Sequence, residues 1–160
     1  MTGYYEAKLN QGQEYQDFVV WELYKQGIII QQFGSRRYQN EIGESLSRYE
    51  IKYDSRISET GNVYIEIAEK SNAQNQYYVK SGVFRDDNTW LYCIGDNTHA
   101  YIISKKLLQQ VCNKPYEYKE KRKIKFKETP TSQGYVIPEE FVRKCLSIAE
   151  VKFTSAFKKE

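Results

Sequence analysis

The sequence predicts a single α/β domain in which α-helices flank both sides of a mixed, mostly antiparallel β-sheet. Three observations lead to this prediction. A chain of 160 residues is long enough for one substantial core. Runs with helical spacing lie at residues 13–26 and 138–148. Short β-branched or aromatic runs, bounded by turn residues, lie between them. We expect residues 13–149 to form the core of one domain that spans residues 1–160, without an internal linker.

The first expected helix, at residues 13–26, ends at Gly27. Its apolar stripe, which includes Tyr15 and Phe18, also contains Glu22. An acid on the core side of a helix usually has a partner. Glu22 could therefore be a partnered acid near the core, or it could reach water at the edge of the stripe.

A β-branched run at residues 27–33 predicts a largely buried strand. The polar connection that follows, residues 34–44, carries Arg36 and Arg37. These two arginines could contact phosphate, or they could belong to an ordinary solvated loop.

Residues 48–54 and 63–70 read as two strands joined by turn residues at 58–62, which predicts a hairpin. Alternation places Glu50, Lys52 and Asp54 on one face of the first strand. If Asp54 lies opposite Glu66, Lys52 lies opposite Ala68. Glu50 then lies opposite Lys70. It could be a second metal ligand, but we expect it to be the ion-pair partner of Lys70.

Directly opposed carboxylates repel each other unless a positive charge lies between them. Asp54 and Glu66 could therefore hold a divalent cation, which prefers oxygen ligands, with Lys52 beside it. Glu44 is a further acid near the first acidic strand. The alternative is a solvated strand face that carries only cross-strand ion pairs.

The second half of the chain predicts strands at residues 90–95 and 99–103 and a helix that begins near residue 105 after the capping residue Ser104. Residues 123–127 alternate and predict a strand with one basic face. The candidate contacts to a phosphate backbone in this basic region are Lys121, Lys123 and Lys125. The alternative is a charged edge strand that prevents aggregation. A last helix is expected at residues 138–148, with a tail that frays after Val151.

Composition and residue spacing argue against a zinc site, a Ser-His-Asp site and a membrane span. The net charge of +3 is too small to prove a nucleic-acid partner by itself. Three widely spaced cysteines and one histidine, His99, do not match the usual zinc spacing or a Ser-His-Asp site. No signal peptide opens the chain, and no apolar run approaches about 20 residues. We therefore expect a cytoplasmic protein with reduced thiols and no membrane partner.

The order of these elements resembles the PD-(D/E)XK, or restriction-endonuclease-like, nuclease superfamily. The segments at residues 50–54 (EIKYD), 60–62 (TGN) and 64–66 (YIE) look like a branch found in phage and mobile-element proteins. Residues 81–83 (SGV), 90–92 (WLY) and 134–138 (GYVIP) also resemble that branch. The likeness covers about residues 13–149.

The resemblance implies a magnesium-dependent deoxyribonuclease in which Asp54 and Glu66 hold Mg²⁺ or Mn²⁺. Glu22 would match an auxiliary acid on the first helix. The superfamily's lysine belongs two residues after Glu66, where this chain has Ala68. Lys52 is the first candidate to replace it.

Lys70 and Lys80 are the other candidates for the lysine. If none of the three reaches the site, the protein is a catalytically inactive nuclease fold that binds DNA or another protein. A homodimer is expected by analogy only, and an α/β domain with no nucleic-acid role is the third alternative.

Overall fold

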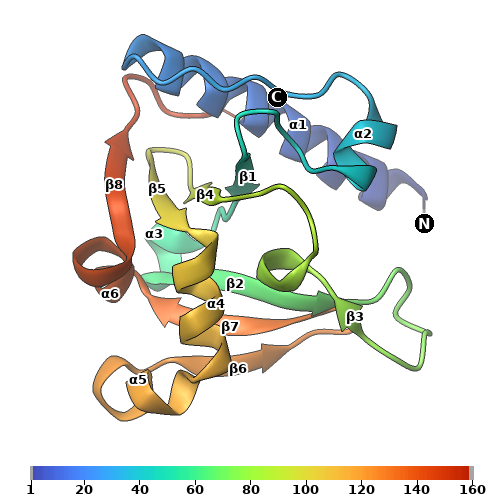
Figure 1. The fold of residues 1–160 in the computed structure, drawn as a ribbon, viewed down its shortest axis with the longest axis vertical. Coiled ribbons are helices and arrows are strands. Elements are labelled where there is room, and N and C mark those ends of the chain that lie inside the picture. Colours follow the sequence, from blue (N-terminus) through green and yellow to red (C-terminus); the bar gives the residue numbers. More distant parts are fainter. Residues whose placement is uncertain (1, 159–160) are drawn as a thin grey trace.

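The protein is built in three layers, with a long helix above a first β-sheet and a second β-sheet below it (Figure 1). The computed structural model describes residues 2–158, and within this range the side chains of residues 9–118 and 123–158. The predicted mixed α/β architecture with helices flanking mostly antiparallel strands is confirmed, but the strands form two sheets instead of one.

Each sheet has four strands. The first has the order β1 (Tyr49–Tyr53), β4 (Leu91–Gly95), β5 (His99–Ser104) and β8 (Ser147–Lys152). The second has the order β3 (Val79–Lys80), β2 (Asn62–Glu69), β7 (Ser132–Pro138) and β6 (Lys125–Glu128). Among the pairings of these strands, only that of β1 with β4 is parallel.

Helices connect and cover the sheets. The α-helices are α1 (Thr2–Lys25), α2 (Arg36–Glu41), α3 (Ile57–Thr60), α4 (Lys105–Asn113), α5 (Pro115–Arg122) and α6 (Glu139–Phe141). A 3₁₀ turn, η1 (Gly82–Phe84), follows β3, and a π-helical turn, η2 (Val142–Leu146), precedes β8. None of the helices in the described part of the chain is long and apolar enough to cross a membrane.

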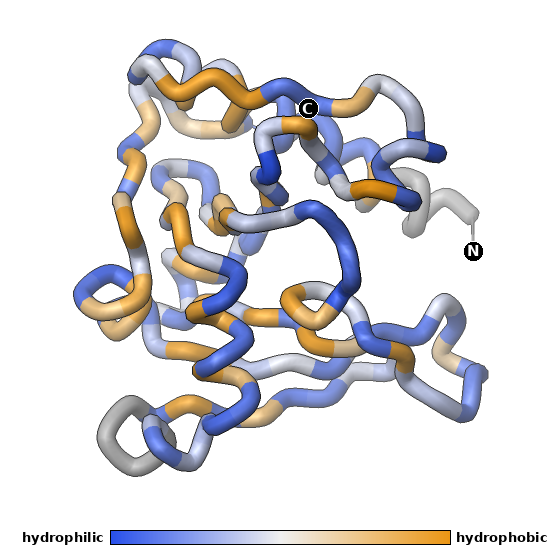
Figure 2. Tube along the Cα trace, in the orientation of Figure 1, coloured by the Kyte–Doolittle hydropathy of each residue, from blue (hydrophilic) through white to orange (hydrophobic). Residues whose placement is uncertain are grey.

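The two central strands of the first sheet, β4 and β5, are buried on both faces, which explains why they are apolar almost throughout. Tyr92 and Ile94 of β4 face the core between the two sheets, whereas Cys93 faces the core under α1. In β5, Ile103 and Ile102 divide between the two cores in the same way. Figure 2 shows these hydrophobic stretches in the interior strands, while the loop between β2 and β3 is largely hydrophilic.

Several predicted elements are confirmed, with shifted boundaries. The first helix begins earlier than expected and ends at Lys25, before Gly27. The strands expected at 90–95 and 99–103 are β4 and β5. The helix after Ser104 is α4, and the Ser104 hydroxyl accepts a hydrogen bond from the backbone N–H of Leu107.

The predicted hairpin between residues 48–54 and 63–70 is wrong. β1 pairs in parallel with β4, and β2 pairs antiparallel with β7 and β3. The turn residues between β1 and β2 form the short helix α3, which ends at Gly61 in the left-handed conformation with φ 64°. This turn of helix carries the chain from one sheet to the other, so that β1 and β2 belong to different layers.

Three further predictions are corrected. Residues 27–33 form no strand and contribute only an isolated bridge between Gln32 and Ser45. The last helical segment, α6 followed directly by η2, ends at Leu146, earlier than expected, and gives way to β8, which completes the first sheet beside β5. The tail after Val151 is packed, since Phe153 and Phe157 contact the aromatic side chains of α1.

Candidate active site

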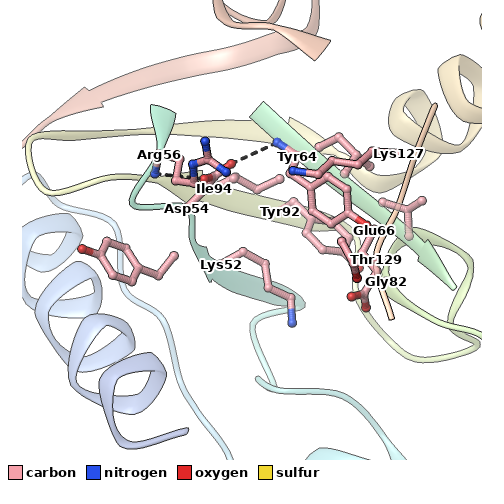
Figure 3. Close-up of a pocket in the computed structure, with 13 residues that line it drawn as sticks. Lys52, Asp54, Arg56, Tyr64, Glu66, Gly82, Tyr92, Ile94, Lys127 and Thr129 are labelled. Atoms are coloured by element: carbon pink, nitrogen blue, oxygen red, sulfur yellow. Dashed lines mark hydrogen bonds between the residues drawn. The ribbon is translucent and has the colours of Figure 1, made fainter. Parts of the chain in front are cut away.

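A cavity of about 330 Å³ lies beside β1, β2 and β4, and three of the predicted site residues line it. Figure 3 shows Asp54, Glu66 and Lys52 in this lining. The structure therefore brings these side chains to one cavity, although the hairpin that was expected to do so does not exist.

Asp54 stabilises the connection between the two sheets. Its carboxylate accepts hydrogen bonds from the backbone N–H of Arg56 at 3.2 Å and from that of Tyr64 at 3.0 Å. The second bond ties the end of β1 to β2. Both carboxylate oxygens are thereby used to fix the backbone around α3.

The Glu66 carboxylate is held by two serine hydroxyls from the segments that flank β2. Its Oε1 accepts a hydrogen bond from the Ser81 hydroxyl at 3.0 Å, and its Oε2 accepts one from the Ser132 hydroxyl at 2.8 Å. In Figure 3, Asp54 and Glu66 lie at opposite ends of the cavity lining, with Tyr64 and Tyr92 between them. The predicted face-to-face pair of carboxylates is therefore not formed.

Lys52 instead joins two other acids. Its ammonium nitrogen lies 2.6 Å from Glu50 Oε1 and 3.5 Å from Glu44 Oε1. Glu50 is therefore the partner of Lys52, and the expected ion pair with Lys70 is wrong. The Lys70 ammonium lies over the Tyr78 ring, 4.2 Å from its centroid.

The strand register places this cluster. Ile51 of β1 belongs to the core under α1, so Glu50 and Lys52 project from the opposite face of the strand. Glu50 is paired in register with Tyr92, and Lys52 with Ile94. Glu44 reaches the cluster from the loop after α2, where its Oε2 accepts hydrogen bonds from Gln16 and from the backbone N–H of Ile51.

The cluster carries more negative than positive charge. Burial raises the pKa of the Glu44 carboxyl; Lys52 partly offsets this, and the nearby Glu50 raises the pKa further. Partial burial disfavours the charged form of Lys52, but the carboxylates of Glu50 and Glu44 outweigh it and raise the Lys52 pKa. A second cation would relieve the repulsion between the two acids that share one ammonium group.

A buried tyrosine hydroxyl lies near these acids. The Tyr92 side chain is buried, and its hydroxyl finds no hydrogen-bond partner of good geometry. Burial and the carboxylate of Glu50 raise the pKa of Tyr92, so the hydroxyl keeps its proton at neutral pH. Its proton can therefore be shared with Glu50 or with a ligand that enters the cavity.

Glu22 does not line this cavity. It is fully buried under the C-terminal segment, where its carboxylate accepts hydrogen bonds from Lys25, from the backbone N–H of Thr154 and from the Ser155 hydroxyl. Of the two readings that the sequence left open, a partnered acid near the core is the one found. Nothing in the geometry links this residue to the acid cluster.

The predicted nucleic-acid contacts are dispersed. Arg36 lines a second cavity of about 520 Å³ together with Glu44 and Lys52. Arg37 forms an exposed ion pair with Glu41. The side chain of Lys121 lies outside the described residues. Lys123, at φ 56°, and Lys125, on β6, are both exposed. Lys80 is exposed on β3 and does not line the cavity.

Gly82 is required beside Glu66. It has φ 53°, and a Cβ atom there would lie 2.2 Å from the Glu66 carbonyl oxygen. We expect Gly82→Ala to lower the free energy of unfolding by about 3 kcal/mol, because it combines backbone strain with a clash against backbone. Urea denaturation measures this.

The control for this substitution is Gly12→Ala in α1, where nothing lies within 4 Å of the added methyl group. We expect the control to raise stability by up to about 1 kcal/mol. A Gly82→Ala protein as stable as the wild type would contradict the close approach between η1 and β2.

The donor set of the cluster suits a hard cation such as Mg²⁺. No three histidine, cysteine, aspartate or glutamate side chains converge as a metal site within the part of the chain that the structure describes. Mg²⁺ is commonly held by one or two carboxylates together with waters and substrate phosphates. Glu44 and Glu50 could provide two such carboxylates.

The sequence contained a signal that points to this cluster. Glu50 and Lys52 are two residues apart and therefore share a face of β1, which gives the spacing of an acid and a lysine on one strand. The resemblance instead assigned the acid and the lysine position to Glu66 and position 68, and the assumed hairpin then placed Lys52 opposite Ala68. Comparison of the chain with protein-family models, with curated proteins and with solved structures finds no match.

Proposed function

We propose that the protein is a metal-dependent nuclease that hydrolyses DNA phosphodiester bonds, with Glu44, Glu50 and Lys52 at its centre. One observation carries the proposal. The Lys52 ammonium lies between two carboxylates at the point where two cavities share its side chain. Paired acids beside a lysine are the groups that this chemistry needs.

Each side chain has a role in the proposed reaction. A bound divalent cation would polarise the scissile phosphate and lower the pKa of an attacking water. Glu44 and Glu50 would hold the cation. Lys52 would orient the water and offset the negative charge that develops on the phosphate. Glu66 also contributes to the electrostatic environment of Lys52 and lines the same cavity.

The resemblance to the PD-(D/E)XK superfamily supports this proposal in a revised form. The superfamily's acid and lysine, two residues apart, would be Glu50 and Lys52, so Ala68 no longer counts against activity. In this form Asp54 fixes the backbone. A homodimer and DNA as the partner stay predictions.

A second candidate function is a DNA-binding module without catalysis. The observation that favours it is the pairing of Lys52 with both acids, which partly neutralises the cluster without a metal ion. Such a module would bind DNA in a salt-sensitive way but would not cleave it.

Metal binding and cleavage separate the two candidates. We expect calorimetry to show Mn²⁺ binding to the wild type that weakens about tenfold or more in Glu44→Gln/Glu50→Gln, because both carboxylate ligands are lost. The matched control is Glu59→Gln/Glu140→Gln, which removes two exposed acids and should bind Mn²⁺ normally.

Cleavage of labelled DNA is measured in parallel. The wild type and the control should cleave with Mg²⁺ or Mn²⁺ and stop cleaving when EDTA is added. DNA binding without cleavage in either metal would favour the second candidate. Mn²⁺ affinity that is equal in the wild type and the double variant would remove Glu44 and Glu50 from the metal site.

A further inference from the structure

Three neighbouring cavities share lining side chains. The 520 Å³ cavity and the 330 Å³ cavity share Lys52 and Tyr53. A third cavity of about 140 Å³ shares four residues with the middle one, including Arg56 and Lys127. The middle cavity therefore adjoins both of the others, and Lys52 of the acid cluster lies where the first cavity meets the middle one.

Each of the three cavities has a positively charged side chain in its lining. Arg36 lines the first cavity, Lys52 stands between the first and the middle cavity, and Arg56 lines the middle and the third. The Arg56 side chain is 60% exposed. Its ion pair with Glu59 is long, with 3.9 Å between Arg56 Nε and Glu59 Oε2, so the guanidinium group is available to a phosphate. Figure 3 shows the Lys127 side chain reaching across Tyr64 towards Arg56. These two cations can bind phosphate on one rim.

The middle cavity has an apolar wall. Ile65, Val83 and Ile94 line it together with the rings of Tyr64 and Tyr92. A volume of about 330 Å³ is at the small end of the range for ligand pockets, which suits one nucleotide. A base inside a double helix is stacked and paired, and it can enter such a cavity only after it has been unstacked at an energetic cost, whereas an unpaired base enters without that cost.

We infer that the joined cavities receive a single strand of DNA, with one unpaired base in the middle cavity. Arg56 and Lys127 bind the phosphates on the rim, and Tyr64 offers its ring to the base. A charged groove that follows the backbone, combined with aromatic rings that accept any base, is the usual basis of single-strand binding. This inference deepens the proposed function and rests on it, because it names unpaired DNA as the substrate.

DNA binding in the absence of metal tests whether the protein prefers a single strand to a duplex. Fluorescence anisotropy with EDTA present compares a labelled single-stranded oligonucleotide with a blunt duplex of the same length. We expect the wild type to prefer the single strand. Arg56→Ala/Lys127→Ala should lose about tenfold in affinity for it, and the slope of log affinity against log salt should fall by about 1.4.

The matched control removes the same charge elsewhere. Lys114→Ala/Lys144→Ala deletes two exposed lysines that do not line the cavities, and its affinity should stay within about twofold of the wild type. Equal losses in the two double variants would overturn the inference, and so would a duplex that binds as tightly as the single strand.

A second measurement tests whether the middle cavity binds one unpaired base. An oligonucleotide with one abasic position is placed so that the gap can occupy the middle cavity, in a series that moves the gap along the strand. We expect one position at which the wild type loses about fivefold or more in affinity. In Tyr64→Leu this difference should disappear, whereas Tyr64→Phe, which keeps the ring, should retain it. No sensitive position in the series would overturn the assignment of the cavity to a base.

The two proposals fail in different ways. If the strand preference holds but no DNA is cleaved, the inference about binding survives and the proposed nuclease activity does not. If DNA is cleaved without preference for a single strand, the nuclease proposal survives and the inference does not.

Discussion

Replacing Lys52 by methionine is expected to lower the rate of DNA cleavage by about 100- to 1,000-fold and, at the same time, to tighten Mn²⁺ binding. The loss of rate follows from removing a cation that stabilises the charge of the transition state. The gain in affinity follows from the ion pairs of Lys52 with Glu50 and Glu44, since the ammonium group competes with a metal ion for the same oxygens. Methionine keeps much of the length of the side chain and removes its charge.

Steady-state cleavage and calorimetry provide the two readouts. Lys80→Met is the control, because it removes an exposed lysine on β3 that does not line the cavity and should change neither quantity. If Lys52→Met cleaves like the wild type, Lys52 is not the catalytic lysine. If it binds Mn²⁺ more weakly, Lys52 holds the acids in place and does not compete with the metal.

Glu22 is expected to contribute to stability as strongly as Gly82. We expect Glu22→Ala to lower the free energy of unfolding by about 3 kcal/mol, because it leaves a cavity and removes the acceptor of the Thr154 N–H and the Lys25 ammonium. Denaturation in urea at neutral pH measures this difference. Asp17→Ala, at the other side of α1, is the control and should change stability by less than about 0.5 kcal/mol.

The effect of Glu22 should depend on pH with a definite sign. Burial opposes its ionisation, but the hydrogen bonds from Lys25 and Thr154 outweigh burial and hold the Glu22 pKa below its usual value. An acid with a lowered pKa in the folded state contributes stability above its unfolded pKa, about 4.3, and loses it as pH falls. The gap between the wild type and Glu22→Gln should therefore be constant from pH 7 to about 5 and narrow below about pH 4. A gap that widens in acid would contradict the lowered pKa.

Local patterns predicted those elements whose partners are adjacent in the sequence. β4, β5 and α4 follow one another along the chain, and alternation, a turn and the capping residue Ser104 were enough to predict them. β1 and β2 were assigned to one hairpin because the sequence does not reveal that β1 pairs with residues 91–95 and β2 with residues 132–138. Long-range pairing overrode the preference of neighbouring strands for each other.

The candidate site was only partly predicted, because its geometry also depends on long-range strand pairing. Alternation on β1 correctly placed Glu50 and Lys52 on one face. The register with β2 was inferred from the assumed hairpin, so Lys52 was assigned to Asp54 and Glu66 and not to Glu50 and Glu44. The role of Glu22 depends on Thr154, which is far away in sequence, and no local pattern could reveal it.

The separation of β1 and β2 into two sheets has a consequence for synthesis of the protein. Every acid of the candidate site lies between Glu44 and Glu66, in the first half of the chain, but β2 acquires its neighbour β7 only with residues 132–138. When the first half of the chain has been synthesised, all of these acids are present, but the strand β7 that positions β2 has not yet been made. Incomplete translation products, and chains truncated before β7, should therefore lack the nuclease activity that we propose for the complete fold.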